Sequence, residues 1–225
     1  MAEGGTVTFS DANGYASAFR DAHIDFTITA AGDFKGQLTW LKLKHLEVYR
    51  SWERLPRIAY ISLPAERIFL SFPVGAAAPT FDGFALRSGD MIFHSRGERV
   101  HQRSNGRCQW GLISLSPEQL ANCSKALTGQ PIAPPLASRI LRPSRAEASK
   151  FQSLVRQACH LAETKRRLIA RPEVARGLEQ ELLYAIIHCL DASEADNHPT
   201  ARHHCRSAKL ICRKRIVSSA KPILS

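Results

Sequence analysis

Histidine, cysteine and carboxylate side chains are the groups in this 225-residue chain that could bind a metal ion or move protons. His94 and His101 lie on either side of Gly97, in the stretch LRSGDMIFHSRGERVHQRSN (residues 86–105). The segment HLE (residues 45–47) is a poor match for a further pair of ligands. A metal site needs three or four converging ligands. We therefore predict no metal site and no cofactor, with His94 and His101 as ordinary loop or edge residues.

A second group of possible ligands lies near the C-terminus, where His203, His204 and Cys205 are followed by Cys212. Their spacing fits no familiar zinc finger, and the segment around them is strongly basic. A basic segment without apolar periodicity does not bury enough surface to fold. We predict that this segment is solvated and disordered.

Sequence motifs for catalysis are missing. The chain contains no GxSxG elbow, no HExxH pair, no P-loop and no GxGxxG. The carboxylates Asp82, Asp90 and Glu98 lie near expected turns, where capping and solvated roles are common, and we expect Asp90 to cap the turn at Gly89. The sequence therefore predicts no catalytic residue and a protein that is not an enzyme.

The elements that would position these groups are short strands between about residues 23 and 115. In residues 23–29, HIDFTIT, apolar and polar side chains alternate, which is the pattern of a half-buried strand. Turn signals recur between such runs: Gly32-Asp33, Leu55-Pro56, Leu63-Pro64, Asp82-Gly83 and Ser88-Gly89. Short strands at regular spacing favour a sandwich or barrel over a parallel sheet with crossover helices.

Five aromatic side chains lie on the predicted strands and have two interpretations. Any single one of them is expected to belong to the core, whereas an aromatic-lined barrel mouth is where a small ligand would bind. We take the set as the candidate ligand-binding residues: Trp40, Tyr60, Phe72, Phe93 and Trp110.

The pattern changes to helical after residue 115. SPE (residues 116–118) is typical of a helix start, and that helix should end near Gly129. Four prolines between residues 131 and 143 predict an extended connector. SRAE (residues 144–147) looks like a capping box before a second amphipathic helix, and a third helix begins at Pro172.

The stretch at residues 86–105 resembles the second signature of the cupin barrel, in which a glycine turn, a strand, a loop and a histidine follow one another. This chain departs from that signature at Ser95, where proline is usual, and at His101, which lies one place late. The resemblance implies a barrel without the cupin metal chemistry.

The barrel, the helix SPEQLANCSKALTGQPI, the proline connector and the helix RPEVARGLEQELLYAIIHCL together resemble the N-terminal half of AraC-type transcription regulators, over roughly residues 20–200. The resemblance implies a mostly β plus α fold, a cupin-like β-barrel followed by a short helix and two amphipathic dimerisation helices. It also implies a small-molecule effector and a homodimer. The corresponding segments are a barrel effector domain (1–130), a proline-rich connector (131–143), a helical dimerisation segment (144–195) and a basic tail (196–225).

The apolar faces of the two long helices carry the candidate dimerisation residues. These faces are wider than packing on one barrel wall requires, which favours a subunit interface. The residues are Leu154, Leu161, Leu178, Leu182 and Ile186.

The family's DNA-binding half carries two helix-turn-helix units, and the residues after Ala201 do not provide one. We interpret the chain as a shortened regulator whose reading frame was lost or ended near residues 196–204. Two alternatives stay open: a small metal-dependent cupin enzyme, or a stand-alone dimerising sensor module.

The net charge of +11 is concentrated in the tail, where seven basic residues follow Thr200 without any acid. This tail would attract DNA phosphates weakly and without sequence preference. There is no apolar run of membrane-spanning length, no signal-peptide pattern and no CxxC among six cysteines. We therefore predict a cytoplasmic protein with free thiols and no membrane partner.

Overall fold

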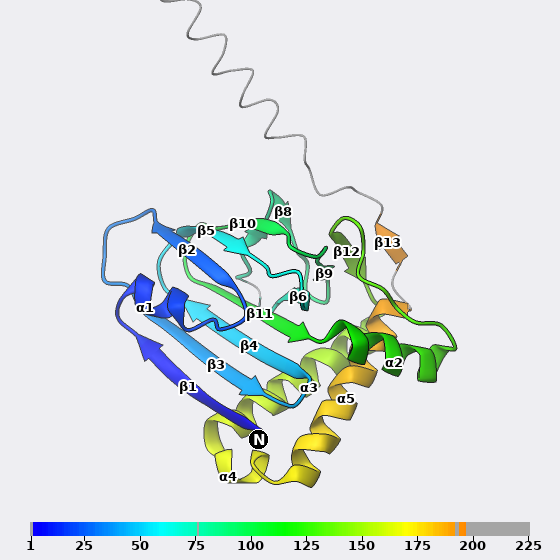
Figure 1. Cartoon of the computed structure of the whole chain (residues 1–225). Coiled ribbons are helices and arrows are strands. Elements are labelled where there is room, and N and C mark those ends of the chain that lie inside the picture. The colour runs from blue at the N-terminus through cyan, green and yellow to red at the C-terminus, as the bar shows by residue number, and fades with distance from the viewer. Residues whose placement is uncertain (1, 76, 192–193, 197–225) are drawn as a thin grey trace, which may run out of the picture.

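The computed structural model describes residues 2–75, 77–191 and 194–196. The described chain is built in layers, with two antiparallel sheets facing each other and a group of helices covering the outer face of the larger sheet (Figure 1). Residues 197–225 of the predicted basic tail (196–225), with its histidines and cysteines, lie outside the described residues, so the predictions for them stay predictions.

The larger sheet has eight strands in the spatial order β1-β3-β4-β11-β6-β9-β12-β13. Its long central strands pair in antiparallel register, for example Trp110 opposite Ser51 on one side and opposite Pro73 on the other. The strands are β1 (Glu3–Phe9), β3 (Gly36–Lys42), β4 (Leu46–Glu53), β6 (Ile68–Pro73), β9 (Met91–Phe93), β11 (Cys108–Leu115), β12 (Arg139–Arg142) and β13 (Glu194–Asp196).

The smaller sheet has five strands in the order β2-β5-β10-β7-β8. Asp82 and Gly83, both with positive φ, form the two-residue turn between β7 and β8, at the Asp-Gly signal noted in the sequence. The strands are β2 (His23–Ile28), β5 (Arg57–Ser62), β7 (Thr80–Phe81), β8 (Phe84–Ala85) and β10 (Arg99–Ser104). The prediction of a β-rich domain followed by helices is confirmed, with the strands divided between two separate sheets.

Alternation along the central strands sends side chains into two different cores. In β6, Leu70 and Phe72 face the helices, whereas Phe69 lies in the core between the two sheets. β11 follows the same rule, with Ile113 on the helix side and Trp110 between the sheets. The larger sheet is therefore buried on both faces, and its outer face shares one apolar core with the helices.

The three predicted helices begin at the residues that the sequence indicated, and the first of them ends at Gly129 as expected. Ser116 caps α2 (Pro117–Thr128), and Gly129 ends it in the left-handed conformation. Ser144 and Glu147 form the predicted capping box of α3 (Arg145–Thr164). The remaining helices are α1 (Ala12–Ser17), α4 (Arg166–Ile169) and α5 (Pro172–Asp191), of which α5 packs against both α3 and α2.

Two N-terminal elements and one strand of the connector were not predicted. β1 carries two glycines, and an added side-chain carbon at Gly4 would lie 2.9 Å from Ala162 of α3, so its position depends on tertiary packing. Asp11 caps α1 through a 2.6 Å hydrogen bond from Gly14 N. In the proline-rich stretch, β12 pairs with β9, which ties the connector to the larger sheet.

The contact between Gly111 of β11 and the Phe72 ring provides a test of this packing. An added side-chain carbon at Gly111 would lie 2.3 Å from that ring. We expect Gly111→Ala to lower the free energy of unfolding by about 1–3 kcal/mol, as overpacking does. In urea unfolding, Gly106→Ala is the control, because its added carbon meets no atom within 4 Å. Equal stability of the two variants would contradict this packing.

Candidate functional site

A carboxylate with five hydrogen bonds lies in the core between the two sheets. Glu53, the last residue of β4, and Arg57, the first residue of β5, are both fully buried and form an ion pair with a 2.7 Å contact from Nε to Oε2. A second contact joins Arg57 Nη2 to Glu53 Oε1 at 3.2 Å. Tyr15 Oη, Trp110 Nε1 and Cys108 Sγ donate to the same carboxylate at 3.0, 2.9 and 3.1 Å. Every donor is directed at one buried negative charge.

The charge states of this group follow from its contacts. Burial raises the pKa of Glu53, but the charge of Arg57 and the hydrogen bonds from Arg57, Trp110 and Cys108 outweigh burial and bring that pKa below its usual range. Burial and the Glu53 charge raise the pKa of Tyr15 and of Cys108. At neutral pH the pair is therefore ionised, and Tyr15 and Cys108 keep the protons that they donate.

The cluster also contains buried donors that are not used. Arg57 Nη2 donates to Gln102 Oε1 at 2.8 Å, and Gln102 is fully buried. Among the described residues, Arg57 Nη1 and Gln102 Nε2 have no hydrogen-bond partner. An unmade hydrogen bond of a buried donor costs about 1–3 kcal/mol. We call Glu53, Arg57 and Gln102 the buried polar cluster; two of its buried N–H donors lack an acceptor among the described residues.

Aromatic side chains of the N-terminal segment cover this cluster. Phe19 stacks on Trp110 with ring centroids 5.4 Å apart and planes inclined by 8°. Phe26 of β2 lies beneath the guanidinium of Arg57, 4.9 Å from ring centroid to Cζ. β1 and β2 are edge strands of the two sheets, and α1 contacts both of them. We call residues 12–19 the plug segment, because they fill the open side between the sheets.

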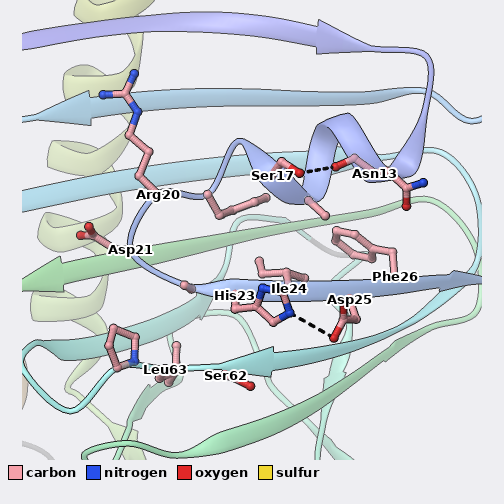
Figure 2. A pocket seen from close by; sticks show the side chains of 14 residues that line it. Asn13, Ser17, Arg20, Asp21, His23, Ile24, Asp25, Phe26, Ser62 and Leu63 are labelled. Carbon is pink, nitrogen blue, oxygen red and sulfur yellow. Dashed lines mark hydrogen bonds and ion pairs between the residues drawn. The ribbon is translucent and has the colours of Figure 1, made fainter.

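A surface groove of about 700 Å³ runs beside the plug segment. Figure 2 shows α1 along one side of it and β2 and β5 along the other; the exposed pair His23 and Asp25, 3.4 Å apart, belongs to β2. Phe19 and Phe26 line this groove and also contact the aromatic and guanidinium groups of the core. These two rings therefore separate the groove from the buried polar cluster.

The structure does not bring the five predicted ligand-binding aromatics to one place. Trp110 lies against the buried polar cluster, and Trp40 is packed at the edge of the same core. Phe72 and Phe93 belong to the core on the helix side of the sheet. Tyr60 is 56% exposed on β5, beside His101. Of the five, Trp110 is the one that touches the cluster, and ligand contact by any of them stays a prediction.

The sequence interpretation missed Glu53, Arg57, Gln102 and Phe19. A signal was present, because Glu53 shares a strand face with Tyr49, and Arg57 occupies the inward phase of β5. Charged residues at inward positions on both sides of a three-residue turn are unusual unless they are paired.

The predicted dimerisation residues divide into two groups. Leu182 and Ile186 are fully buried within the single chain, where α5 meets the sheet and the other helices. Leu154, Leu161 and Leu178 are half-buried on α3 and α5. The first pair stabilises the chain itself, and a role of the five in pairing two chains stays a prediction.

His94 lies in the loop directly after β9, as the sequence indicated, but it is buried and both of its ring nitrogens are engaged. Its Nε2 lies 2.8 Å from Ser71 Oγ and its Nδ1 lies 3.0 Å from Glu98 Oε2. The order serine, histidine, carboxylate is that of hydrolase triads. However, Ser71 is only 2% exposed, and the hollow beside His94 measures about 10 Å³. This network joins strands in the interior and leaves no room for a substrate.

Two further features bear on the predicted partners. In the described part of the chain, no three histidine, cysteine or acidic side chains gather closely enough to hold a metal ion. Among the described helices, none combines the length and apolar character that crossing a bilayer requires.

The expected capping role of Asp90 is confirmed, since its carboxylate accepts from Arg87 N at 2.8 Å beside Gly89.

Comparison with solved structures finds proteins of similar fold. One of them is described as the crystal structure of the AraC-like transcriptional activator CuxR, with a TM-score of 0.53 and 13% sequence identity. The match covers 96% of this chain and 81% of that chain. No family model and no curated protein matches the sequence. At this identity the likeness establishes the fold alone.

The ionised Glu53 makes stability depend on pH in a defined direction. Since the pKa of Glu53 is lower in the folded chain than the ~4.3 of an unfolded glutamate, the pair stabilises the fold above that pH and its contribution is lost on acidification. Glu53→Gln should cost about 3–5 kcal/mol at neutral pH. We expect this difference from wild type to shrink below about pH 4.

Urea unfolding between neutral and acid pH measures this difference. Glu66→Gln is the matched control, because Glu66 is exposed, and it should behave as wild type throughout. A penalty for Glu53→Gln that stays constant with pH would show that Glu53 is not ionised in the folded protein.

Proposed function

We propose that this chain is the ligand-sensing and dimerising part of an AraC-like transcription regulator. The observation that carries the proposal is the pair of unused donors, Arg57 Nη1 and Gln102 Nε2, inside a fold shared with such a regulator. A buried cationic group with a free donor is expensive unless a ligand uses it. The helices α3 and α5 pack on the sheet, so we assign this region sensing and pairing of chains rather than the reading of DNA bases.

The effector in this proposal is a small molecule with acceptor oxygens. It enters from the groove beside α1 and displaces the Phe19 and Phe26 rings that separate the groove from the cluster. Its oxygens accept from Arg57 and Gln102, and an apolar face takes the place of Phe19 on Trp110. Binding then favours the chain conformation in which the plug segment has moved, which is a population shift.

The dimer in this proposal uses the half-buried leucines of the α3–α5 pair. Leu154 and Leu161 lie seven residues apart on α3, two helical turns along one stripe, and Leu178 lies on α5. Burial of these side chains against a second copy completes an apolar surface that one chain leaves half-exposed.

The effector site is tested with Gln102→Met, which keeps the volume but removes the Nε2 donor and also Oε1, the acceptor for Arg57 Nη2. In thermal unfolding against a panel of small sugars, amino acids and carboxylates, a true effector at 100 times its Kd adds about 2.7 kcal/mol to wild-type stability. We expect Gln102→Met to weaken its binding about tenfold. Gln157→Met, on the exposed face of α3, is the control and should respond as wild type. A compound that stabilises all three proteins equally would place its site elsewhere.

The dimer is tested with the double variant Leu154→Asp/Leu161→Asp. We expect a dimeric wild type and a folded, monomeric variant by size-exclusion chromatography with light scattering, because two half-buried leucines become charged. Ser149→Asp, an exposed position of the same helix, should leave the dimer intact. A monomeric wild type at tens of micromolar would contradict the proposal.

A further inference from the structure

A second groove lies on the opposite side of the larger sheet, between its outer face and α3. It measures about 680 Å³ and is lined from β3, β4, β6 and β11 on one side and from α3 on the other. Because the central sheet separates it from the buried polar cluster, this groove is not part of the effector site proposed above. We call it the α3 groove.

The lining of the α3 groove is basic and contains no acidic residue. Arg50, Arg107 and Arg156 contribute three guanidinium groups. Glu163 forms an ion pair with Arg50 and accepts from Thr39 Oγ1 at 2.8 Å, so Arg50 is already neutralised. Among the described residues, Arg107 and Arg156 form no ion pair, and both are exposed. Two cationic groups without a counter-charge therefore face the same hollow.

The groove also has aromatic and apolar surface. Trp52 lies beneath the Arg107 guanidinium, 5.2 Å from ring centroid to Cζ, which orients that cation. Trp52 and Val74 are the half-buried apolar side chains of the lining, whereas Phe72 and Val155 are almost fully buried. The groove thus combines positive charge with apolar surface, the composition expected of a site for an organic anion.

We propose that the α3 groove binds an organic anion with a flat apolar body. Its carboxylate or phosphate accepts from Arg107 and Arg156, and its apolar body lies against the half-buried side chains of Trp52 and Val74. Charge-assisted hydrogen bonds of guanidinium groups are suited to both anions. Since Arg156 and Leu154 both belong to α3, an anion bound here would also change the position of the helix that the proposed dimer uses.

Calorimetric titration of the full chain with 2-naphthoate and 2-naphthyl phosphate tests the proposal, with 2-naphthamide as the neutral analogue. We expect the anions to bind, the amide to bind at least about tenfold more weakly, and Arg107→Ala and Arg156→Ala each to weaken anion binding by about tenfold. Glu163→Gln should have the opposite effect and tighten binding, because it frees the Arg50 guanidinium. The tighter of the two anions identifies the preferred head group.

Two control variants distinguish anion binding in the α3 groove from anion binding elsewhere on the protein. Arg103→Ala removes an exposed arginine of β10 outside the groove and should leave anion binding unchanged. Gln102→Met should also leave it unchanged, so loss of the effector site and loss of the α3 groove are distinguishable. The proposal is overturned if neither anion binds at about 1 mM, if the amide binds equally well, or if Arg107→Ala/Arg156→Ala has no effect.

Discussion

The ion pair between Glu53 and Arg57 is the interaction on which the interior of this protein depends. Removing two charges from water costs several kcal/mol per ion, and that cost is offset only when each charge is fully hydrogen-bonded. Glu53 meets this condition through donors from four side chains, which joins the plug segment, β5 and β11 to the end of β4. Arg57 does not meet it, because one of its nitrogens has no partner in the described chain.

This asymmetry links the fold to the proposed sensing. A fully satisfied pair would be a structural feature alone, whereas a pair with a free donor beside Gln102 is prepared for one more acceptor. Phe19 and Phe26 shield the cluster from the water in the surface groove. They lie at the edge of the two sheets, where the described strands form no hydrogen-bond ladder that joins one sheet to the other. The helices lie on the far face of the larger sheet, so a change at the plug segment can reach them through β1, which contacts both α1 and α3, and through the strands that carry Glu53 and Trp110.

Sequence patterns predicted the parts of this fold that depend on local interactions. The caps at Ser116 and Ser144 and the helix end at Gly129 are properties of a few adjacent residues, and each was found where expected. β1 was not predictable, because its glycine-rich strand depends on α3 for its place. The buried polar cluster was missed for a related reason, since the register of β4, β5 and β10 determines that its side chains meet.

Effector binding at the buried polar cluster is best tested through the indole N–H signals of the three tryptophans, Trp40, Trp52 and Trp110, in an isotope-labelled protein. Trp110 Nε1 donates to Glu53, whereas Trp52 is a lining residue of the α3 groove, so the two signals report on different sites. A compound that raises the unfolding temperature as an effector should shift the Trp110 signal, because it must displace Phe19 from that ring. Stabilisation by such a compound with an unchanged Trp110 signal would contradict effector binding at the buried polar cluster.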